Sequence, residues 1–476
     1  MSFLRDTVKS AGAGLVMTVS RFFAMAIIAR ELGVAHFGIL GFSIFCLDLI
    51  ALFALAGLPG VTSRFMPLAS LRERPVFARM IRIWLSASVT VVLAAAPLVA
   101  ATVIGLKAEA IWIFAAWAVL TVAQTATLAQ LQGALRFDLA AWGNACAAAV
   151  LLLGAWLFVT SGDLTSAFLV LAATVLVQFL PVLLLWSGLA KARPPRDAAD
   201  GLPDRRAIMA YGLNAWLAAL TTAIVWGRGE VLVIESMLSA EMLGYYGAAM
   251  TLLALVWRMT QMLQGAVAPH LSARIKSGGA ELHRFVTQVN RLTLAISAGT
   301  ALMLALCGQE LAVIVFGEQF RRTGEVLAFL APGAAVAGVG TVNLSVQYLS
   351  EGRFTRNAVI VAAIALLSLT AFLIPDFEIL GAATARTVIL IGMSASMPIW
   401  LIISGYTGIG RRVGVELLTA ILTVGAASLL NLSVELPFGV RAALWFGMTY
   451  LIFARATESF VPTGMLRGGV RLLRAL

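Results

Sequence analysis

The chain has 476 residues, of which 61% are hydrophobic and only 12% are charged, and its mean hydropathy is +0.95. A soluble domain of this length is far less apolar, so the composition predicts a polytopic membrane protein. The net charge of +11 would suggest a nucleic-acid partner in a soluble protein. Here the Lys and Arg residues cluster between apolar segments, as topology signals do, and we expect no nucleic-acid binding.

Fourteen apolar segments follow one another along the chain, each long enough to cross a hydrocarbon core about 30 Å thick. They fall near residues 11–31, 37–59, 80–104, 110–131, 139–160, 166–190, 208–235, 241–268, 288–316, 325–349, 357–375, 378–404, 414–431 and 437–457. We predict an all-α polytopic membrane protein with 14 transmembrane helices. Two parallel six-helix lobes would surround a central cationic cavity, and two extra helices would follow at the C-terminus.

A polar stretch rich in Pro, Arg and Asp separates the sixth segment from the seventh, which predicts a linker between two lobes. The predicted regions are an N-terminal six-helix lobe at 1–190, a cytoplasmic linker at 191–207, a C-terminal six-helix lobe at 208–404, and an additional helix pair with a cytoplasmic tail at 405–476.

The two lobes also resemble each other in sequence. The stretch 37–41 opens the second segment much as 243–247 opens the eighth, and Arg136 closes the fourth segment as Arg353 closes the tenth. Halves of six helices have the same orientation in a membrane. The axis relating them would therefore run along the membrane normal, with a binding site between the repeats near the midplane.

Basic residues outside the segments fall almost entirely on one side of the predicted membrane. Only Lys107, Arg321 and Arg322 lie in the gaps on the other side, which instead collect acids such as Glu109 and Glu318. Loops rich in Lys and Arg stay in the cytoplasm. We therefore expect both chain termini to be cytoplasmic.

Two charged residues interrupt the first two segments at mid-membrane depth. Arg21 lies in the first segment and Asp48 in the second. A charge that faces lipid there costs several kcal/mol, so such residues usually face a partner or a wet cavity and mark a transport path. Asp48 is the best candidate for a proton or cation switch that couples transport to a gradient. The alternative is that Arg21 and Asp48 form a neutralising structural pair.

Further polar residues recur at helical spacing and predict the lining of a binding cavity. Arg228 occupies nearly the same place in the seventh segment as Arg21 in the first, so the two would face each other from opposing lobes. The remaining candidate substrate-binding residues are Asn214, Arg258, Gln261, Asn343 and Gln347. In the alternative interpretation the Asn and Gln side chains only join helices through hydrogen bonds.

Two other arginines lie inside apolar segments. Arg291 is so near the start of its helix that we expect its side chain to reach the cytoplasmic surface. Arg386 has no obvious acid partner in its own helix, and its sequence context assigns it no role.

Enzyme and cofactor signatures are absent from the sequence. There is no Walker loop, dinucleotide Gly pattern, zinc-binding HExxH or nucleophile elbow. The three His and three Cys residues offer no ligand spacing, so we expect no metal and no cofactor. Transport would then draw on a gradient or on substrate flow, and we expect no enzymatic activity.

Several short motifs resemble those of a known superfamily. Ala29-Arg30-Glu31-Leu32-Gly33 and Ala56-Gly57-Leu58-Pro59-Gly60 are similar to the opening of the polysaccharide-exporting, Wzx-type branch of the multidrug, oligosaccharidyl-lipid and polysaccharide exporter superfamily. The stretches 239–246 and 316–320 resemble later parts of the same proteins, so the similarity covers the whole chain.

The resemblance implies a flippase in the bacterial inner membrane. Its substrate would be an undecaprenyl-diphosphate-linked oligosaccharide, moved by alternating access from the cytoplasmic to the periplasmic leaflet for O-antigen, capsule or exopolysaccharide synthesis, with a polysaccharide polymerase as a possible partner. A peptidoglycan-precursor flippase is an alternative, because those proteins also carry a Ser-Arg pair in the first helix, which Ser20-Arg21 resembles. A multidrug exporter and a membrane glycosyltransferase remain further alternatives.

Overall fold

The computed structural model describes residues 2–66, 73–134, 136–159, 162–189, 204–277, 279–350 and 353–457. Every regular element within these residues is a helix. A bilayer core offers no water to backbone groups, and a helix satisfies them all within one segment. The predicted all-α membrane fold is confirmed.

Ten helices of the described part are long and apolar enough to cross a membrane, and two of them join two spans at a kink. Helix α1 (Ser2–Leu55) departs from helical geometry at Gly33, where φ is 76°, and α13 (Arg353–Ile403) does so at Glu378, where φ is 49°. With the shorter apolar stretch in α6 (Leu164–Leu189) and with α15 (Phe438–Thr457), the described helices account for the fourteen predicted spans.

By its contacts, the chain divides into two compact units, 1–231 and 232–476. Unit 1 begins with α1 and ends just after a six-residue π-helix, η1. Its other elements are α2 (Leu58–Phe65), α3 (Arg74–Thr102), α4 (Ala108–Gly133), α5 (Phe137–Phe158), α6, α7 (Arg205–Thr222) and η1 (Ala223–Arg228).

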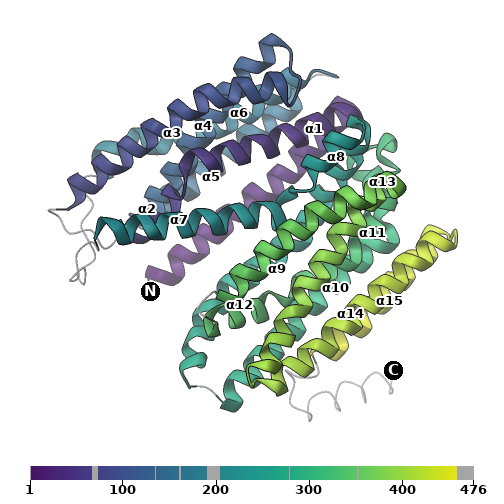
Figure 1. Ribbon diagram of the computed structural model, residues 1–476. Coiled ribbons are helices and arrows are strands. Elements are labelled where there is room, and N and C mark those ends of the chain that lie inside the picture. The colour runs from purple at the N-terminus through teal and green to yellow at the C-terminus, as the bar shows by residue number, and fades with distance from the viewer. Residues whose placement is uncertain are drawn as a thin grey trace. The chain divides into compact units, whose positions relative to one another are not determined.

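Within unit 1, α1 packs against α5 and α3, and α4 packs between α3 and α6 (Figure 1). The rings of Phe114, Trp117 and Phe168 join α4 to α6, with centroids 5.7 to 6.3 Å apart. The last long helix of the unit, α7, contacts α2 and α1. These contacts place α7 beside the segment that contains Asp48.

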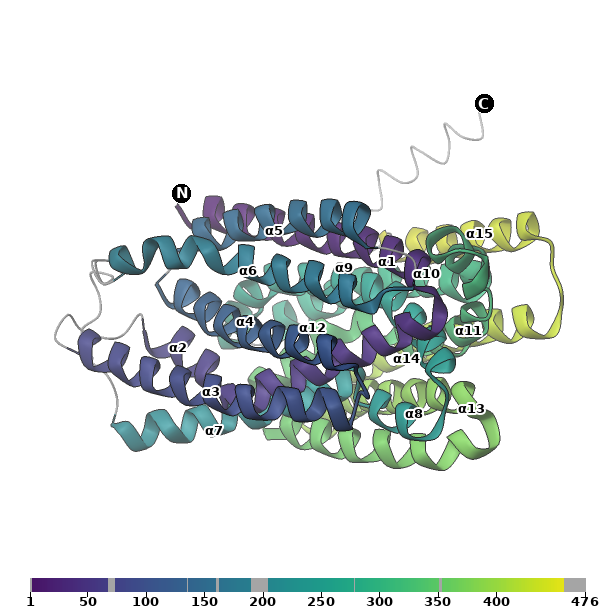
Figure 2. The same cartoon turned by 90° about the horizontal axis from the view of Figure 1, so that it is seen from above.

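Unit 2 is built around one long helix, α10. Its elements are α8 (Val231–Met237), α9 (Ala240–Ser277), α10 (Gly279–Phe316), η2 (Glu318–Phe320), α11 (Thr323–Ala335), η3 (Val336–Val339), α12 (Gly340–Leu349), α13, α14 (Thr407–Ser433) and α15. Helix α10 packs against α9, α11, α14 and α15. Figure 2 shows α14 and α15 joined as a hairpin, which is the predicted extra helix pair.

The boundary between the two units differs from the predicted linker. Helix α7 opens the second sequence repeat, yet its contacts with α2 and α1 place it in unit 1. Packing and sequence repetition thus divide the chain at different points. The regions derived from the repeat stay a prediction, and most of the linker lies outside the described residues.

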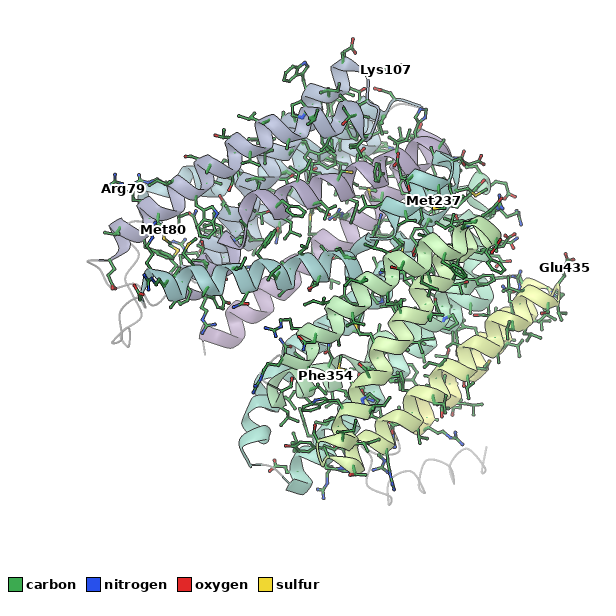
Figure 3. The ribbon with its side chains drawn as sticks, in the orientation of Figure 1. Arg79, Met80, Lys107, Met237, Phe354 and Glu435 are labelled. Atoms are coloured by element: carbon green, nitrogen blue, oxygen red, sulfur yellow. The ribbon has the colours of Figure 1, made fainter. Side chains whose placement is uncertain are left out.

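Large apolar side chains cover the outside of both units, as the lipid-facing surface of a membrane protein requires. Trp112 and Trp156 of unit 1 are each 70% exposed, and Phe372 of unit 2 is 72% exposed. Figure 3 shows Arg79 near one end of α3 and Lys107 beyond its other end. Helix α3 therefore runs from one side of the predicted membrane to the other between these two residues, and which side is cytoplasmic stays a prediction.

Candidate functional site

The motif Ala56-Gly57-Leu58-Pro59-Gly60 forms a sharp break between α1 and α2. Ala56 has a φ of 43° and Gly57 a φ of 86°, both in the left-handed region, and Pro59 occupies the first turn of α2. A Cβ on Gly57 would lie 2.1 Å from the backbone oxygen of Gly212 in α7. Only a glycine leaves α7 enough room here, so the motif makes a close helix crossing possible.

Aromatic side chains of α7 fix this crossing. The indole Nε1 of Trp216 donates a hydrogen bond to the carbonyl oxygen of Leu52 at 3.1 Å, and its ring packs edge-on against Phe53. The guanidinium of Arg64 lies 4.4 Å from the ring centroid of Tyr211. A cation over an aromatic face is attracted to it, so α2 and α7 are joined at this end as well.

A cavity of about 370 Å³ lies between α1, α2, α4 and α7, and all of its lining residues belong to unit 1. Most of the lining is Ala, Leu, Gly and Pro, and the polar members are Asp48, Thr121 and Thr125. The side chain of Asp48 is accessible to a water-sized probe although protein surrounds it on most sides. An apolar cavity with a few convergent polar groups is the common form of a ligand site.

Two arginines act electrostatically on the Asp48 carboxylate. They are Arg21 of α1 and Arg228 at the end of η1, so the structure brings together the three charged residues that the sequence singles out. Both arginines favour the ionised form of the carboxylate through their positive charge. Arg21 is exposed and Arg228 is half-buried. The group carries one net positive charge when Asp48 is ionised.

The π-helix η1 sets the position of Arg228. Backbone geometry leaves the helical region at Gly227, where ψ is −124°, just before the arginine. The Nη1 atom of Arg228 lies 3.8 Å from the place that a Cβ on Gly41 of α1 would occupy. Short π-helical turns inside longer helices are frequent at functional sites. The expectation that Arg21 and Arg228 face each other from opposing lobes differs from the packing, because both lie in unit 1.

The other predicted lining residues are not all gathered at this cavity. Asn214 is exposed on α7, while Asn343 is half-buried and Gln347 exposed on α12 of unit 2. The side chains of Arg258 and Gln261 lie outside the described residues. Sequence reasoning missed Thr121 and Thr125, although their four-residue spacing places both on one face of α4.

Arg386 is completely buried in unit 2. Its guanidinium lies 4.8 Å from the centroid of the Trp257 ring, so α13 and α9 meet there through a cation–π contact. A desolvated contact of this type contributes about 2 kcal/mol. The sequence could not assign this role, because Trp257 and Arg386 lie in different helices.

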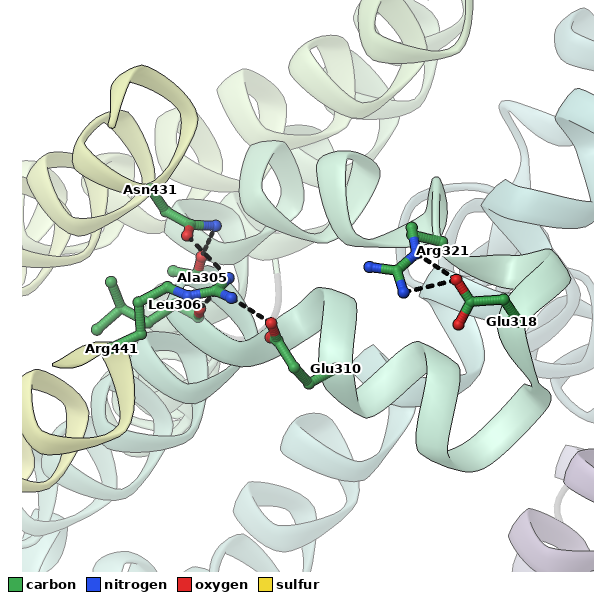
Figure 4. A network of polar contacts seen from close by, with 7 residues as sticks. All are labelled: Ala305, Leu306, Glu310, Glu318, Arg321, Asn431 and Arg441. Carbon is green, nitrogen blue, oxygen red and sulfur yellow. Dashed lines mark hydrogen bonds and ion pairs between the residues drawn. The ribbon is translucent and has the colours of Figure 1, made fainter. Parts of the chain in front are cut away.

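Ion pairs fasten the α14–α15 hairpin to α10 near both ends. Arg291 pairs with Glu416 of α14 at 2.7 Å, and the Arg291 side chain keeps 29% of its surface exposed. The expectation that Arg291 reaches the cytoplasmic surface stays a prediction. Farther along α10, Glu310 pairs with Arg441 of α15, which also donates to the side-chain oxygen of Asn431 at 3.3 Å (Figure 4). Each of these charges has a fixed partner within unit 2.

Comparison with known proteins assigns the fold and the family. The chain has the fold of the lipid II flippase MurJ in an inward closed conformation, with a TM-score of 0.62, 11% identity and coverage of 95% of this chain and 99% of that one. It also resembles an inward-facing multidrug resistance MATE family transporter of the MOP superfamily, with a TM-score of 0.56, 15% identity and coverage of 86% and 95%.

No curated protein is significantly similar to this chain in sequence. Residues 27–324 match the family model described as polysaccharide biosynthesis protein. The match covers more than half of the chain, and it agrees with the polysaccharide branch that the sequence motifs resemble. This chain is therefore a multi-pass membrane protein of the polysaccharide biosynthesis protein family, with a transporter fold.

Proposed function

We propose that this protein is a flippase for an undecaprenyl-diphosphate-linked oligosaccharide, which it moves by alternating access from the cytoplasmic to the periplasmic leaflet. The observation that carries the proposal is the group of Arg21, Asp48 and Arg228 in unit 1, in which Asp48 lines a cavity and the two arginines act on its carboxylate. The family match supports a role in polysaccharide synthesis.

The chemistry of the group suits a diphosphate. Arg presents a planar fork of donors, stays charged at any working pH, and binds phosphate oxygens in pairs. Such contacts strengthen where bulk water is excluded. A diphosphate in this position would also compensate charges that are otherwise costly within a membrane. Arg21 and Arg228 are thus the proposed headgroup ligands.

Asp48 would tune the affinity of the group for the headgroup. With Asp48 ionised, the three residues carry one net positive charge, and with Asp48 protonated they carry two, which matches the two negative charges of a diphosphate diester. Protonation would therefore favour binding, and loss of the proton would favour release. This coupling makes Asp48 the proposed proton switch.

The remaining predicted residues extend this model. Asn214 lies on α7, and Asn343 and Gln347 lie on α12 of unit 2. Together with Arg258 and Gln261 they would contact the glycan or the lipid during transport. The protein would lie in the bacterial inner membrane with both termini in the cytoplasm. A polysaccharide polymerase would then receive the flipped product.

A flipping assay in proteoliposomes tests the proposal. Fluorescent lipids would be quenched selectively in the outer leaflet, and the rate of their exposure would be measured for undecaprenyl-diphosphate-oligosaccharide and for the monophosphate-linked analogue. We expect the diphosphate to be flipped faster. Arg21→Ala and Arg228→Ala should abolish this flipping, while the Lys replacements should retain part of it because charge survives without the fork.

A peptidoglycan-precursor flippase is the second candidate, supported by the TM-score of 0.62 with MurJ. Lipid II carries the same diphosphate on the same type of lipid, so the arginines would serve either substrate. Adding lipid II as a third substrate separates the two candidates. Faster flipping of lipid II than of other diphosphate-linked oligosaccharides would replace the polysaccharide proposal. Equal flipping of diphosphate and monophosphate lipids would contradict both.

A further inference from the structure

One membrane span of unit 2 is interrupted near its middle. Helix α11 contains Pro332 and ends at Ala335, a 3₁₀ turn covers Val336–Val339, and α12 begins at Gly340. Proline removes a hydrogen bond from a helix, and a 3₁₀ turn changes the pairing of the groups around it. Backbone groups freed in a membrane need other partners.

Neighbouring hydroxyl groups supply some of these partners. Thr293 and Ser297 of α10 donate to the carbonyl oxygens of Gly338 at 2.6 Å and Ala335 at 2.7 Å. The helices are in close contact here, since a Cβ on Gly338 would lie 2.4 Å from the Cα of Leu294. The interrupted span is therefore held against α10 by side-chain hydrogen bonds.

These two bonds also define the register of the contact. Ser297 lies opposite Ala335, and Thr293, one turn earlier in α10, lies opposite Gly338. One turn before Thr293 in α10 lies Asn290, and three residues after Gly338 in the interrupted span lies Thr341. Helices α10 and α12 are in contact, and continuing this register predicts that Asn290 and Thr341 lie on facing surfaces.

Both side chains are completely buried, with 0% of each residue exposed. Within the described residues, the amide oxygen and nitrogen of Asn290 and the hydroxyl of Thr341 have no hydrogen-bond partner. A buried polar group without a partner loses its hydrogen bonds to water and gains none in return, which destabilises the fold. Native interiors commonly meet this need with a buried water that makes about three hydrogen bonds.

We infer that Asn290 and Thr341 form a buried water-binding site at the interruption of the α11–α12 span. The chemistry favours water over an ion. A cation at the amide oxygen of Asn290 would leave the buried amide nitrogen without an acceptor, and an anion at the nitrogen would leave the oxygen without a donor, whereas water both donates and accepts. The water would complete the hydrogen bonding at the break and hold α12, which carries Asn343 and Gln347, against α10.

Hydroxyl-radical footprinting of the full-length protein in lipid nanodiscs tests this site. Radicals generated from a bound water oxidise the side chains that touch it, and mass spectrometry locates the products. In the wild type we expect oxidation of Val286, one turn before Asn290 in α10, or of Val342, which follows Thr341; both valines are buried. In Asn290→Leu and in Thr341→Val we expect this oxidation to fall several-fold.

Thr300→Val is the matched control, because Thr300 lies on the same helix and its hydroxyl already donates to the carbonyl oxygen of Ile296. Its footprint should equal that of the wild type. Absence of oxidation at the buried valines in a wild-type protein that is labelled elsewhere would overturn the inference. So would a high-resolution map in which the Asn290 amide bonds directly to Thr341. Neither result depends on the transported substrate.

Discussion

The two units differ in the partners of the charged side chains that lie within their membrane-spanning helices. In unit 1, Asp48 interacts electrostatically with Arg21 and Arg228, and it lines a cavity. In the hairpin region of unit 2, Glu310 and Arg441 contact each other directly and are mostly buried. The first arrangement leaves room for a ligand, whereas the second is complete in itself.

This difference separates functional charges from structural ones. A charge with a fixed, buried partner stabilises helix association, and removing the partner leaves an uncompensated charge. Asp48 lines a cavity, so the two arginines that act on its carboxylate can exchange this partner for a ligand that enters there. We therefore expect substitutions in the hairpin region to reduce the amount of folded protein, and substitutions of the unit 1 arginines to reduce transport while the protein stays folded.

The largest loss of stability is expected for Arg441→Ala. It would leave Glu310 buried without its cation and remove the bond to Asn431, and breaking a buried pair in this way costs about 3–5 kcal/mol. The yield and melting temperature of the purified protein measure the effect. Adding Glu310→Gln should restore part of the loss, because no orphaned charge then remains. A melting temperature of Arg441→Ala equal to that of the wild type would contradict the structural role.

Gly57→Ala should also destabilise the protein, and its effect would fall on the cavity of unit 1. The new Cβ would collide with the backbone of Gly212, and a φ of 86° is strained for alanine by about 1–3 kcal/mol. The control is Gly14→Ala, where nothing lies within 4 Å of the new atom. Thermal unfolding should show a lower melting temperature for Gly57→Ala and an unchanged one for Gly14→Ala. Equal melting temperatures of the two variants would contradict the close crossing of α2 and α7.

Trp216→Phe tests the contribution of a single hydrogen bond between α7 and α1, and its expected effect is smaller. The ring contact with Phe53 would persist, but the hydrogen bond to the Leu52 carbonyl would be lost, at a cost of about 1 kcal/mol. The melting temperature should fall slightly. Transport should fall as well if the position of α7 shapes the cavity. An unchanged melting temperature would show that this bond contributes no stability.

The smallest effect is expected for Arg321→Ala. Its pairing with Glu318 is as direct as that of Arg441 with Glu310, but both side chains are more than half exposed (Figure 4). The Arg321 hydrogen bond holds the pKa of the Glu318 carboxyl below its ordinary value, yet solvent screens exposed pairs of this kind. The melting temperature should equal that of the wild type. A clear decrease in melting temperature would show that an exposed ion pair can stabilise the protein as a buried one does, which would contradict the distinction by burial.

The sequence predicted the number of spans, the extra helix pair and the charges Arg21, Asp48 and Arg228. These features follow from local properties, since apolar length defines a span and a charge inside one stands out. The interpretation of Ala56-Gly57-Leu58-Pro59-Gly60 was limited to a resemblance. Its physical role depends on Gly212, which lies far away in the chain and shows no local signal.

Partners between distant helices account for what the sequence could not predict. The sequence did not indicate the pair of Arg291 with Glu416, because the two residues lie 125 positions apart. The contact of Arg386 with Trp257 and the packing of α7 in unit 1 also depend on partners in other helices, which the sequence does not identify. Hydrophobic periodicity indicates which face of a helix is apolar, but it does not indicate which helix covers that face.

Binding of the headgroup to the arginines of unit 1 is the central claim, and a direct affinity measurement tests it. Purified wild type, Arg21→Ala, Arg228→Ala and Arg291→Ala would be titrated with a fluorescent undecaprenyl-diphosphate-oligosaccharide in nanodiscs. Loss of one arginine contact should weaken binding by about tenfold or more, equivalent to about 1.4 kcal/mol, in the first two variants. Arg291→Ala should bind as the wild type does, although it is less stable. Unchanged affinity in folded Arg21→Ala and Arg228→Ala proteins would contradict the claim.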